Sequence, residues 1–86
     1  MPIISSFQGI DIRMNPNEHN PPHFHAEYQG VKAVFDFDGN LLRGNMPQRQ
    51  TRFILAWIEF HKDELKANWE RIEKQEPLSK IDPLRK

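Results

Sequence analysis

The alternation of apolar and polar positions divides this 86-residue chain into a β-rich first half and a helical second half. In residues 2–14, β-branched side chains recur at alternate positions, so that apolar side chains share one face. Residues 23–44 hold three further short runs, separated by Xaa-Gly pairs that are typical of hairpin turns. The pattern therefore predicts an antiparallel β-meander over residues 1–46.

From Pro47 onward the apolar period changes to steps of three and four, which indicates a helix with one buried stripe. The stripe consists of Ile54, Ile58, His61, Leu65, Trp69 and Ile72. Pro47 suits the first turn and Pro77 ends the pattern, so we expect a helix over residues 47–76. Such a helix is longer than short strands can cover. We expect it to break near residues 61–64 or to overhang the sheet and meet the tail or another chain.

The tail, residues 77–86, suits an extended strap docked on the domain. Its apolar side chains are Leu78, Ile81 and Leu84. A chain of this length forms one domain with a modest core. We therefore predict a single α+β domain over residues 1–86, in which a small antiparallel meander packs against one long, continuous or broken, C-terminal helix.

Composition narrows the function classes. Twelve basic and twelve acidic residues balance, so attraction to nucleic acid or anionic lipid cannot come from overall charge and any anion binding must be local. There is no cysteine, which excludes disulfides and thiolate zinc sites. No secretory leader or membrane-spanning stretch is recognisable, so we expect a cytoplasmic protein that does not contact a membrane.

The stretch "EHNPPHFHAEY", residues 18–28, is the strongest candidate for a site. Strand alternation places His23, His25 and Glu27 on the face opposite the core. A two-residue turn at Gln29-Gly30 would set these side chains across from Asp36, Val34 and Lys32, respectively. The two prolines stiffen the loop before the strand, which favours a preorganised site.

Three interpretations of the histidines stay open. His19, His23 and His25 could ligate a divalent transition metal such as zinc or iron, together with a carboxylate. Alternatively, His23 and His25 form a catalytic acid/base pair or contact an anion without metal, because imidazole both accepts and donates protons near neutral pH. The third interpretation is that they are paired surface residues. His61, alone on the apolar stripe, is expected to be a hydrogen-bonded core histidine.

Three arginines, Arg43, Arg49 and Arg52, surround the predicted helix start, where the helix dipole disfavours positive charge. Either they pair internally with Asp36 and Asp38, or they bind an external anion such as phosphate. We favour the internal pair for Arg43 and the external anion for Arg49.

Phe53, Trp57 and Phe60 form a second apolar strip on the helix, hereafter the aromatic strip. The strip either adds to the core or forms an interface with a partner. The excess helix length favours association with a second copy of the chain or with another small protein.

Several segments carry a family resemblance: "MPIISSFQGIDIRM", "HNPPHFHAEYQG", "MPQR", "LAWIEFHKDELKANWE" and "EPLSKIDPL". They resemble the short bacterial proteins of domain of unknown function family 4160. The resemblance implies a small cytoplasmic protein that pairs with another short protein, in an arrangement like a toxin–antitoxin operon. It implies no catalytic residue.

The function we expect first is therefore a component of a two-protein, toxin–antitoxin-like module that binds its partner and, as a further candidate ligand, RNA. The alternative is a small histidine-dependent hydrolase or nuclease, with or without a metal, in which Arg49 or Arg52 holds phosphate. A regulatory domain without chemistry is the third interpretation. Whether the chain is an enzyme stays open at this point.

Overall fold

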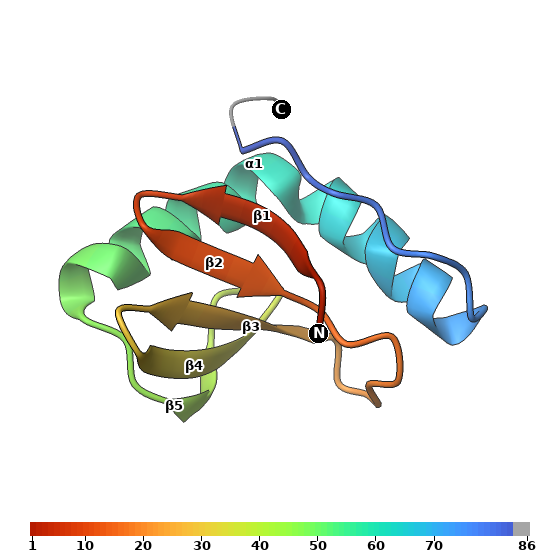
Figure 1. Ribbon diagram of the computed structural model, residues 1–86, viewed down its shortest axis with the longest axis horizontal. Coiled ribbons are helices and arrows are strands. Elements are labelled where there is room, and N and C mark those ends of the chain that lie inside the picture. Colours follow the sequence, from red (N-terminus) through yellow and green to blue (C-terminus); the bar gives the residue numbers. More distant parts are fainter. Residues whose placement is uncertain (84–86) are drawn as a thin grey trace.

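The structure, a computed structural model, describes residues 1–83 and consists of one antiparallel sheet and one helix (Figure 1). The strands are β1 (Ile3–Phe7), β2 (Ile10–Arg13), β3 (His23–Tyr28), β4 (Val31–Asp36) and β5 (Leu41–Gly44), and the helix is α1 (Gln48–Glu73). The strands are hydrogen-bonded in their sequence order, β1-β2-β3-β4-β5. The predicted α+β class and the β-meander are therefore confirmed.

Strand pairing at the centre of the sheet follows the predicted register. The β3–β4 turn consists of Gln29 and Gly30, which both have positive φ, as tight hairpins between twisted strands require. His23 lies opposite Asp36, His25 opposite Val34, and Glu27 opposite Lys32. This register places both histidines on the face of the sheet opposite the buried side chains of Phe24 and Ala26.

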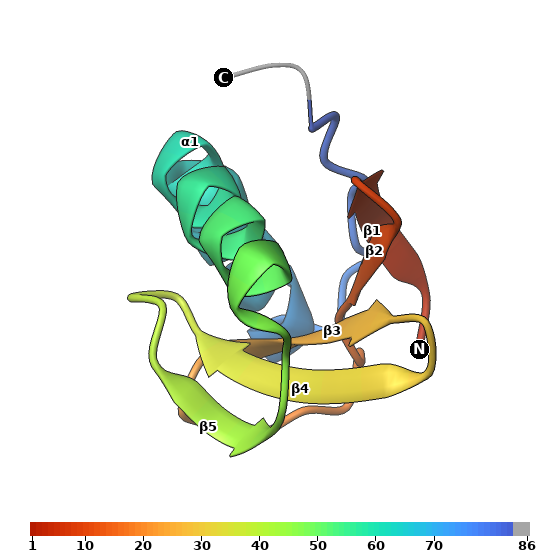
Figure 2. The same ribbon diagram turned by 90° about the vertical axis from the view of Figure 1, so that its left-hand side faces the viewer.

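The core lies between the sheet and α1, and Figure 2 shows the sheet curling around the helix. The sheet contributes fully buried apolar side chains, among them Ile10, Ile12 and Phe24, and Met14, directly after β2, is also fully buried. The helix contributes its predicted stripe, of which every member is buried. Apolar side chains at period two in the strands and near 3.6 in the helix therefore meet in one layer.

The helix kinks at His61, whose φ of −126° and ψ of 20° are not helical. This confirms the predicted break near residues 61–64. The His61 side chain is 1% exposed, and its Nδ1 lies 2.6 Å from Glu64 Oε1. The prediction of a hydrogen-bonded core histidine is confirmed as well.

The tail turns back after α1, runs alongside the second half of the helix and reaches the outer edge of β1 (Figure 1). The amide of Ile81 donates to the Ile4 carbonyl at 2.6 Å, and the Ile81 side chain is 3% exposed. The buried Asn68 amide binds both backbone groups of Ser79, donating to its carbonyl at 2.8 Å and accepting from its N–H at 2.9 Å. The predicted strap is confirmed for Ile81 and for the partly buried Leu78; Leu84 lies outside the described residues.

The aromatic strip divides between core and surface. Trp57 is 4% exposed and packs against Phe7 and Phe24, at ring-centroid distances of 5.4 and 5.5 Å. Phe53 is partly buried against the core, whereas Phe60 is 55% exposed. The core interpretation holds for Trp57, and a partner contact through all three rings would require Trp57 to leave the core.

Among residues 1–83, no helix has both the length and the apolar character needed to cross a membrane.

Candidate functional site

The loop between β2 and β3 brings a carboxylate to the histidines of β3. It begins with a turn in which the side chain of Asn15 accepts the amide of Asn17 at 3.0 Å and its carbonyl accepts the amide of Glu18 at 3.2 Å. Trp69 of α1 donates its indole N–H to Asn20 at 3.3 Å, which anchors the loop to the helix. Glu18 is thereby directed back towards the sheet.

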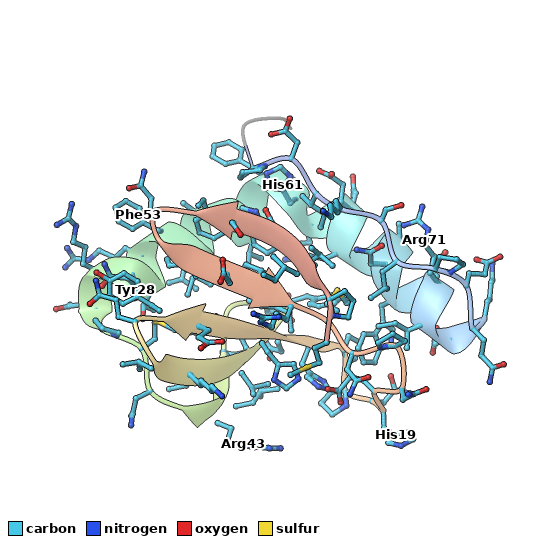
Figure 3. The ribbon with its side chains drawn as sticks, viewed as in Figure 1. His19, Tyr28, Arg43, Phe53, His61 and Arg71 are labelled. Carbon is cyan, nitrogen blue, oxygen red and sulfur yellow. The ribbon has the colours of Figure 1, made fainter. Side chains whose placement is uncertain are left out.

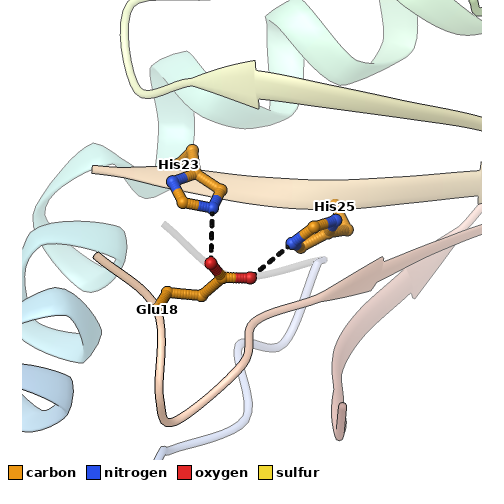
Figure 4. Close-up of side chains that lie close together, drawn as sticks. All are labelled: Glu18, His23 and His25. Atoms are coloured by element: carbon orange, nitrogen blue, oxygen red, sulfur yellow. Dashed lines mark hydrogen bonds and ion pairs between the residues drawn. The ribbon is translucent and has the colours of Figure 1, made fainter. Parts of the chain in front are cut away.

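Glu18, His23 and His25 converge on one point, and Figure 4 shows the carboxylate between the two imidazole rings. His25 Nε2 lies 2.7 Å from Glu18 Oε1, and His23 Nε2 lies 3.1 Å from Glu18 Oε2. The three side chains are 13–24% exposed, so water reaches the cluster without surrounding it. We call these residues the Glu–His cluster.

The hydrogen bond at the other nitrogen of His23 fixes the state of its ring. Nδ1 lies 2.7 Å from the carbonyl oxygen of Pro21, and because a carbonyl only accepts, Nδ1 carries a proton and donates it. In a neutral ring, Nε2 then presents a lone pair to the Glu18 carboxylate. Nε2 lies 3.1 Å from Glu18 Oε2, so the two atoms are close enough to share one positive centre such as a metal ion.

The electrostatics of Glu18 agree with a site built for positive charge. Partial burial works to raise the pKa of Glu18, but the hydrogen bond from His25 and the charges of His23 and His25 outweigh it and hold the pKa below its usual value. The carboxylate is therefore ionised at neutral pH and available as an acceptor or a metal ligand.

The cluster has the composition and spacing of a metal site. Its candidate ligand atoms all lie within 4.8 Å of one another. Ligands bound at about 2.0–2.2 Å in a tetrahedron are roughly 3.3–3.6 Å apart, so small side-chain rotations suffice to bring them onto one ion. The bond from Nδ1 of His23 to a backbone carbonyl is the type of contact that orients metal-ligating histidines.

His19 does not join the cluster, and Glu18 takes the place that sequence reasoning gave to it. His19 is exposed and lines a hollow of about 450 Å³ beside the cluster, which is also lined by Leu42 and Arg43. Figure 3 shows His19 and Arg43 at the lower edge of the molecule. The sequence signal for Glu18 was its position directly before His19 in a proline-stiffened loop.

The three arginines are not brought together. Arg43 lies on β5, opposite Val34, whereas Arg49 and Arg52 lie on the first turns of α1. Arg49 stacks over the ring of Phe53, with its guanidinium carbon 5.7 Å from the centroid. Within residues 1–83, none of the three forms an ion pair.

The expected internal pairing of the arginines, including the pair favoured for Arg43, is wrong. Asp36 accepts the backbone amides of Asp38 and Asn40 and the side-chain amide of Asn40, at 2.8–2.9 Å. Asp38 pairs instead with Lys62 at 3.2 Å. The carboxylate of Asp36 is hydrogen-bonded within the turn after β4, and that of Asp38 is paired with Lys62. Neither carboxylate is therefore a partner for the arginines.

Comparison with known proteins gives a family. The model of the family described as domain of unknown function DUF4160 matches residues 9–70, a span that includes the whole Glu–His cluster and most of α1. The chain belongs to this family. No curated protein and no solved structure matches it.

Proposed function

We propose that this DUF4160 protein binds one divalent transition metal ion through Glu18, His23 and His25 and is a metal-dependent hydrolase. The observation that carries the proposal is the convergence of the three ligand atoms within 4.8 Å, with His23 oriented by its Nδ1 contact to the Pro21 carbonyl. Two imidazoles and one carboxylate suit zinc, and they also suit non-haem iron.

The chemistry follows from the number of protein ligands. With three protein ligands, a bound ion such as zinc would keep at least one position open for water and would lower the pKa of that water to about 7. In hydrolysis, the water oxygen would bond to the electrophilic centre of the substrate while the bond from this centre to the leaving-group oxygen breaks. One water proton would stay with the acid product or pass to solvent, and the leaving-group oxygen would take up the equivalent of the other. Glu18, His23 and His25 would hold the ion, and His19, which lines the adjacent hollow, would supply the proton to the leaving group.

Thermal unfolding of protein without an affinity tag tests the metal site. At a zinc or nickel concentration about 100 times Kd, binding stabilises the native state by about 2.7 kcal/mol, which corresponds to a rise in Tm of roughly 10–20 °C for a domain of this size. The double variant His23→Ala/His25→Ala should lose this rise. His19→Ala is the matched control and should keep it, because His19 is not in the Glu–His cluster.

An absence of any metal-dependent shift in Tm would refute the metal site. Hydrolysis is tested separately with chromogenic phosphate and carboxylate esters, in the presence of zinc and then of EDTA. Activity should disappear with EDTA and in Glu18→Ala. Tight metal binding without hydrolysis of either ester class would leave a structural metal site and refute the enzymatic part of the proposal.

A second function, membership of a bacterial, cytoplasmic two-protein module, is favoured by the free edge of the sheet. The tail covers the edge of β1, but the outer edge of β5 pairs with no strand among residues 1–83. Leu41 and Leu42 on β5 are 51% and 46% exposed. An open strand edge with apolar side chains suits the addition of a strand from a partner protein or from a second copy.

The solution mass and the protection of β5 test this second function. Light scattering of the isolated protein should give a dimer if the partner is a second copy. With a hetero-partner, the isolated chain should have its monomer mass of 10.2 kDa, and the amides of β5 should become protected from hydrogen exchange only when the partner protein is added. Rapid exchange of the β5 amides in the assembled species would exclude β5 as the contact.

A further inference from the structure

The outer face of the sheet carries a second hollow next to the Glu–His cluster. Side chains from four neighbouring strands form a row across this face, because Arg13 pairs with His25, His25 with Val34, and Val34 with Arg43. The hollow along this row has a volume of about 490 Å³, and Lys32 also lines it. We call it the cationic hollow.

The charge of this hollow is not balanced within the described residues. Arg13, Lys32 and Arg43 line it together with one carboxylate, that of Glu27. Glu27 lies 3.8 Å from Arg13, at a distance and exposure that make the pair weak. Lys32 and Arg43 have no ion pair in the described part of the chain. Two cationic side chains therefore stand unneutralised in one concavity.

The floor of the hollow is apolar, and its wall is held in place by backbone geometry. Val34 is only 9% exposed although it lies on the face away from the helical core. Gly44 has a φ of +80°, and a Cβ there would collide with the carbonyl oxygen of Lys32. The amide of Asn45 donates to the same carbonyl at 3.1 Å. Close approach of β5 to β4 thus fixes the strand that carries Arg43.

We infer that the cationic hollow binds the phosphate group of a phosphate ester, and that this ester is the substrate of the hydrolase proposed above, on which the substrate assignment rests. Arg43 lines both the cationic hollow and the hollow beside the Glu–His cluster, and His25 lines both as well. A phosphate held by Arg43 therefore lies beside the candidate metal. The guanidinium group binds two phosphate oxygens at once, which orients the ester as well as attracting it.

A nucleotide or a nucleotide unit of single-stranded RNA fits this description. A volume of about 490 Å³ is in the range of pockets that hold small organic ligands. The apolar floor offers contact to a sugar or base, while the cations hold the phosphate. Inorganic phosphate has the charge of a nucleotide but no sugar or base to contact the apolar floor. An RNA strand has further phosphates that can contact the row of cationic side chains.

An NMR titration of the metal-free protein in EDTA tests the hollow independently of the metal site. The probes are inorganic phosphate, a mononucleotide and a short single-stranded RNA. We expect all three to shift the amides of residues 25–27, 32–34 and 43–44, with the mononucleotide and the RNA binding more tightly than phosphate alone. Tighter binding of RNA than of the mononucleotide, with an affinity that falls as salt rises, would identify the strand as the source of the phosphate.

Variants of one arginine give the decisive comparison. Arg43→Ala should weaken binding about tenfold, since it removes a charge-assisted contact, and Arg43→Lys should recover part of the loss because it keeps the charge but not the fork. Lys74→Ala is the control, an exposed cationic side chain that does not line the hollow, and it should bind as the unaltered protein does.

Three results would overturn the inference: no shifts at millimolar ligand, unaltered binding by Arg43→Ala, or shifts confined to residues 47–52. The last result would instead support the anion site predicted at Arg49 and Arg52. The two proposals fail separately. Phosphate binding without metal binding would refute the proposed hydrolase but support the cationic hollow as a phosphate site. Metal-dependent hydrolysis of carboxylate esters without phosphate binding would support the hydrolase and refute the phosphate site.

Discussion

Replacing Glu18 with glutamine tests whether its charge holds the Glu–His cluster together. Glu18→Gln keeps the shape of the side chain but removes the charge that faces His23 and His25. A hydrogen bond to a charged group contributes about 1.5–3 kcal/mol. The Glu18 side chain is 20% exposed, so solvent screening favours the lower end of this range.

We therefore expect Glu18→Gln to lower the free energy of unfolding of the metal-free protein by about 1.5 kcal/mol at pH 7, and Tm by roughly 6–12 °C. The effect should depend on pH with a definite sign. The pKa of Glu18 is lower in the folded protein than its ordinary value of 4.5, so the folded state binds this proton less readily than the unfolded state. The stability due to Glu18 is thus present above pH 4.5 and is lost as pH falls through the folded pKa.

Urea unfolding in EDTA, followed by tryptophan fluorescence between about pH 7 and pH 3, measures both effects. The difference between the unaltered protein and Glu18→Gln should shrink as the pH falls. Glu27→Gln is the control, because Glu27 makes only a 3.8 Å contact with Arg13 at an exposed position and should change stability by less than about 0.5 kcal/mol. A difference that stays constant down to pH 3 would show that the charge of Glu18 does not stabilise the fold.

Two further predictions concern parts of the fold that support the site. Asn68→Leu should destabilise the protein by about 2–4 kcal/mol in urea unfolding, because it leaves both backbone groups of Ser79 without a partner, whereas Ser79→Ala should be nearly neutral since only its backbone is used. Trp69→Phe should cost about 1 kcal/mol more than the loss of packing alone, because its N–H donates to Asn20. Trp57→Phe removes an N–H that has no partner in the described residues and should lack this additional cost.

Local pattern was sufficient to predict the sheet and the helix. The turn at Gln29-Gly30 determines the β3–β4 register, and a register shift by one residue would have moved every apolar side chain to the opposite face. The repeat of three and four residues likewise predicted the buried stripe of the helix, including His61 at the break. These features depend on neighbours in sequence or on one repeating period, both of which a single sequence contains.

The parts of the site that depend on loop geometry were harder to predict from the sequence. His23 and His25 lie on a strand, so alternation placed them correctly, but the third member of the cluster comes from a loop that has no period. Proximity in the sequence to the two prolines favoured His19, whereas the turn at Asn15 brings the preceding residue, Glu18, to the rings. The cationic hollow depends on pairing across four strands, which no local pattern encodes.

The internal pairing of the arginines failed for a related reason. Asp36 and Asp38 lie near the helix start in the sequence, but in the structure Asp36 accepts hydrogen bonds within the turn that it begins, and Asp38 pairs with Lys62. A carboxylate at the first position of a tight turn binds backbone amides close by before it can meet a distant arginine.

The position of the Glu–His cluster links ligand binding to the packing of the helix. The ring of His23 lies 5.5 Å from that of Trp69, and Trp69 also holds the loop through Asn20. The second half of α1, beyond the kink at His61, is therefore the support on which the loop carrying Glu18 rests. If the ion binds only when the loop is docked on α1, ion binding and loop docking stabilise each other. The free energy that docking adds to ion binding equals the free energy that the ion adds to docking. Loosening the second half of α1 should consequently weaken metal affinity at a distance from the ligands, while binding at the cationic hollow, whose residues all lie outside α1, should be much less affected.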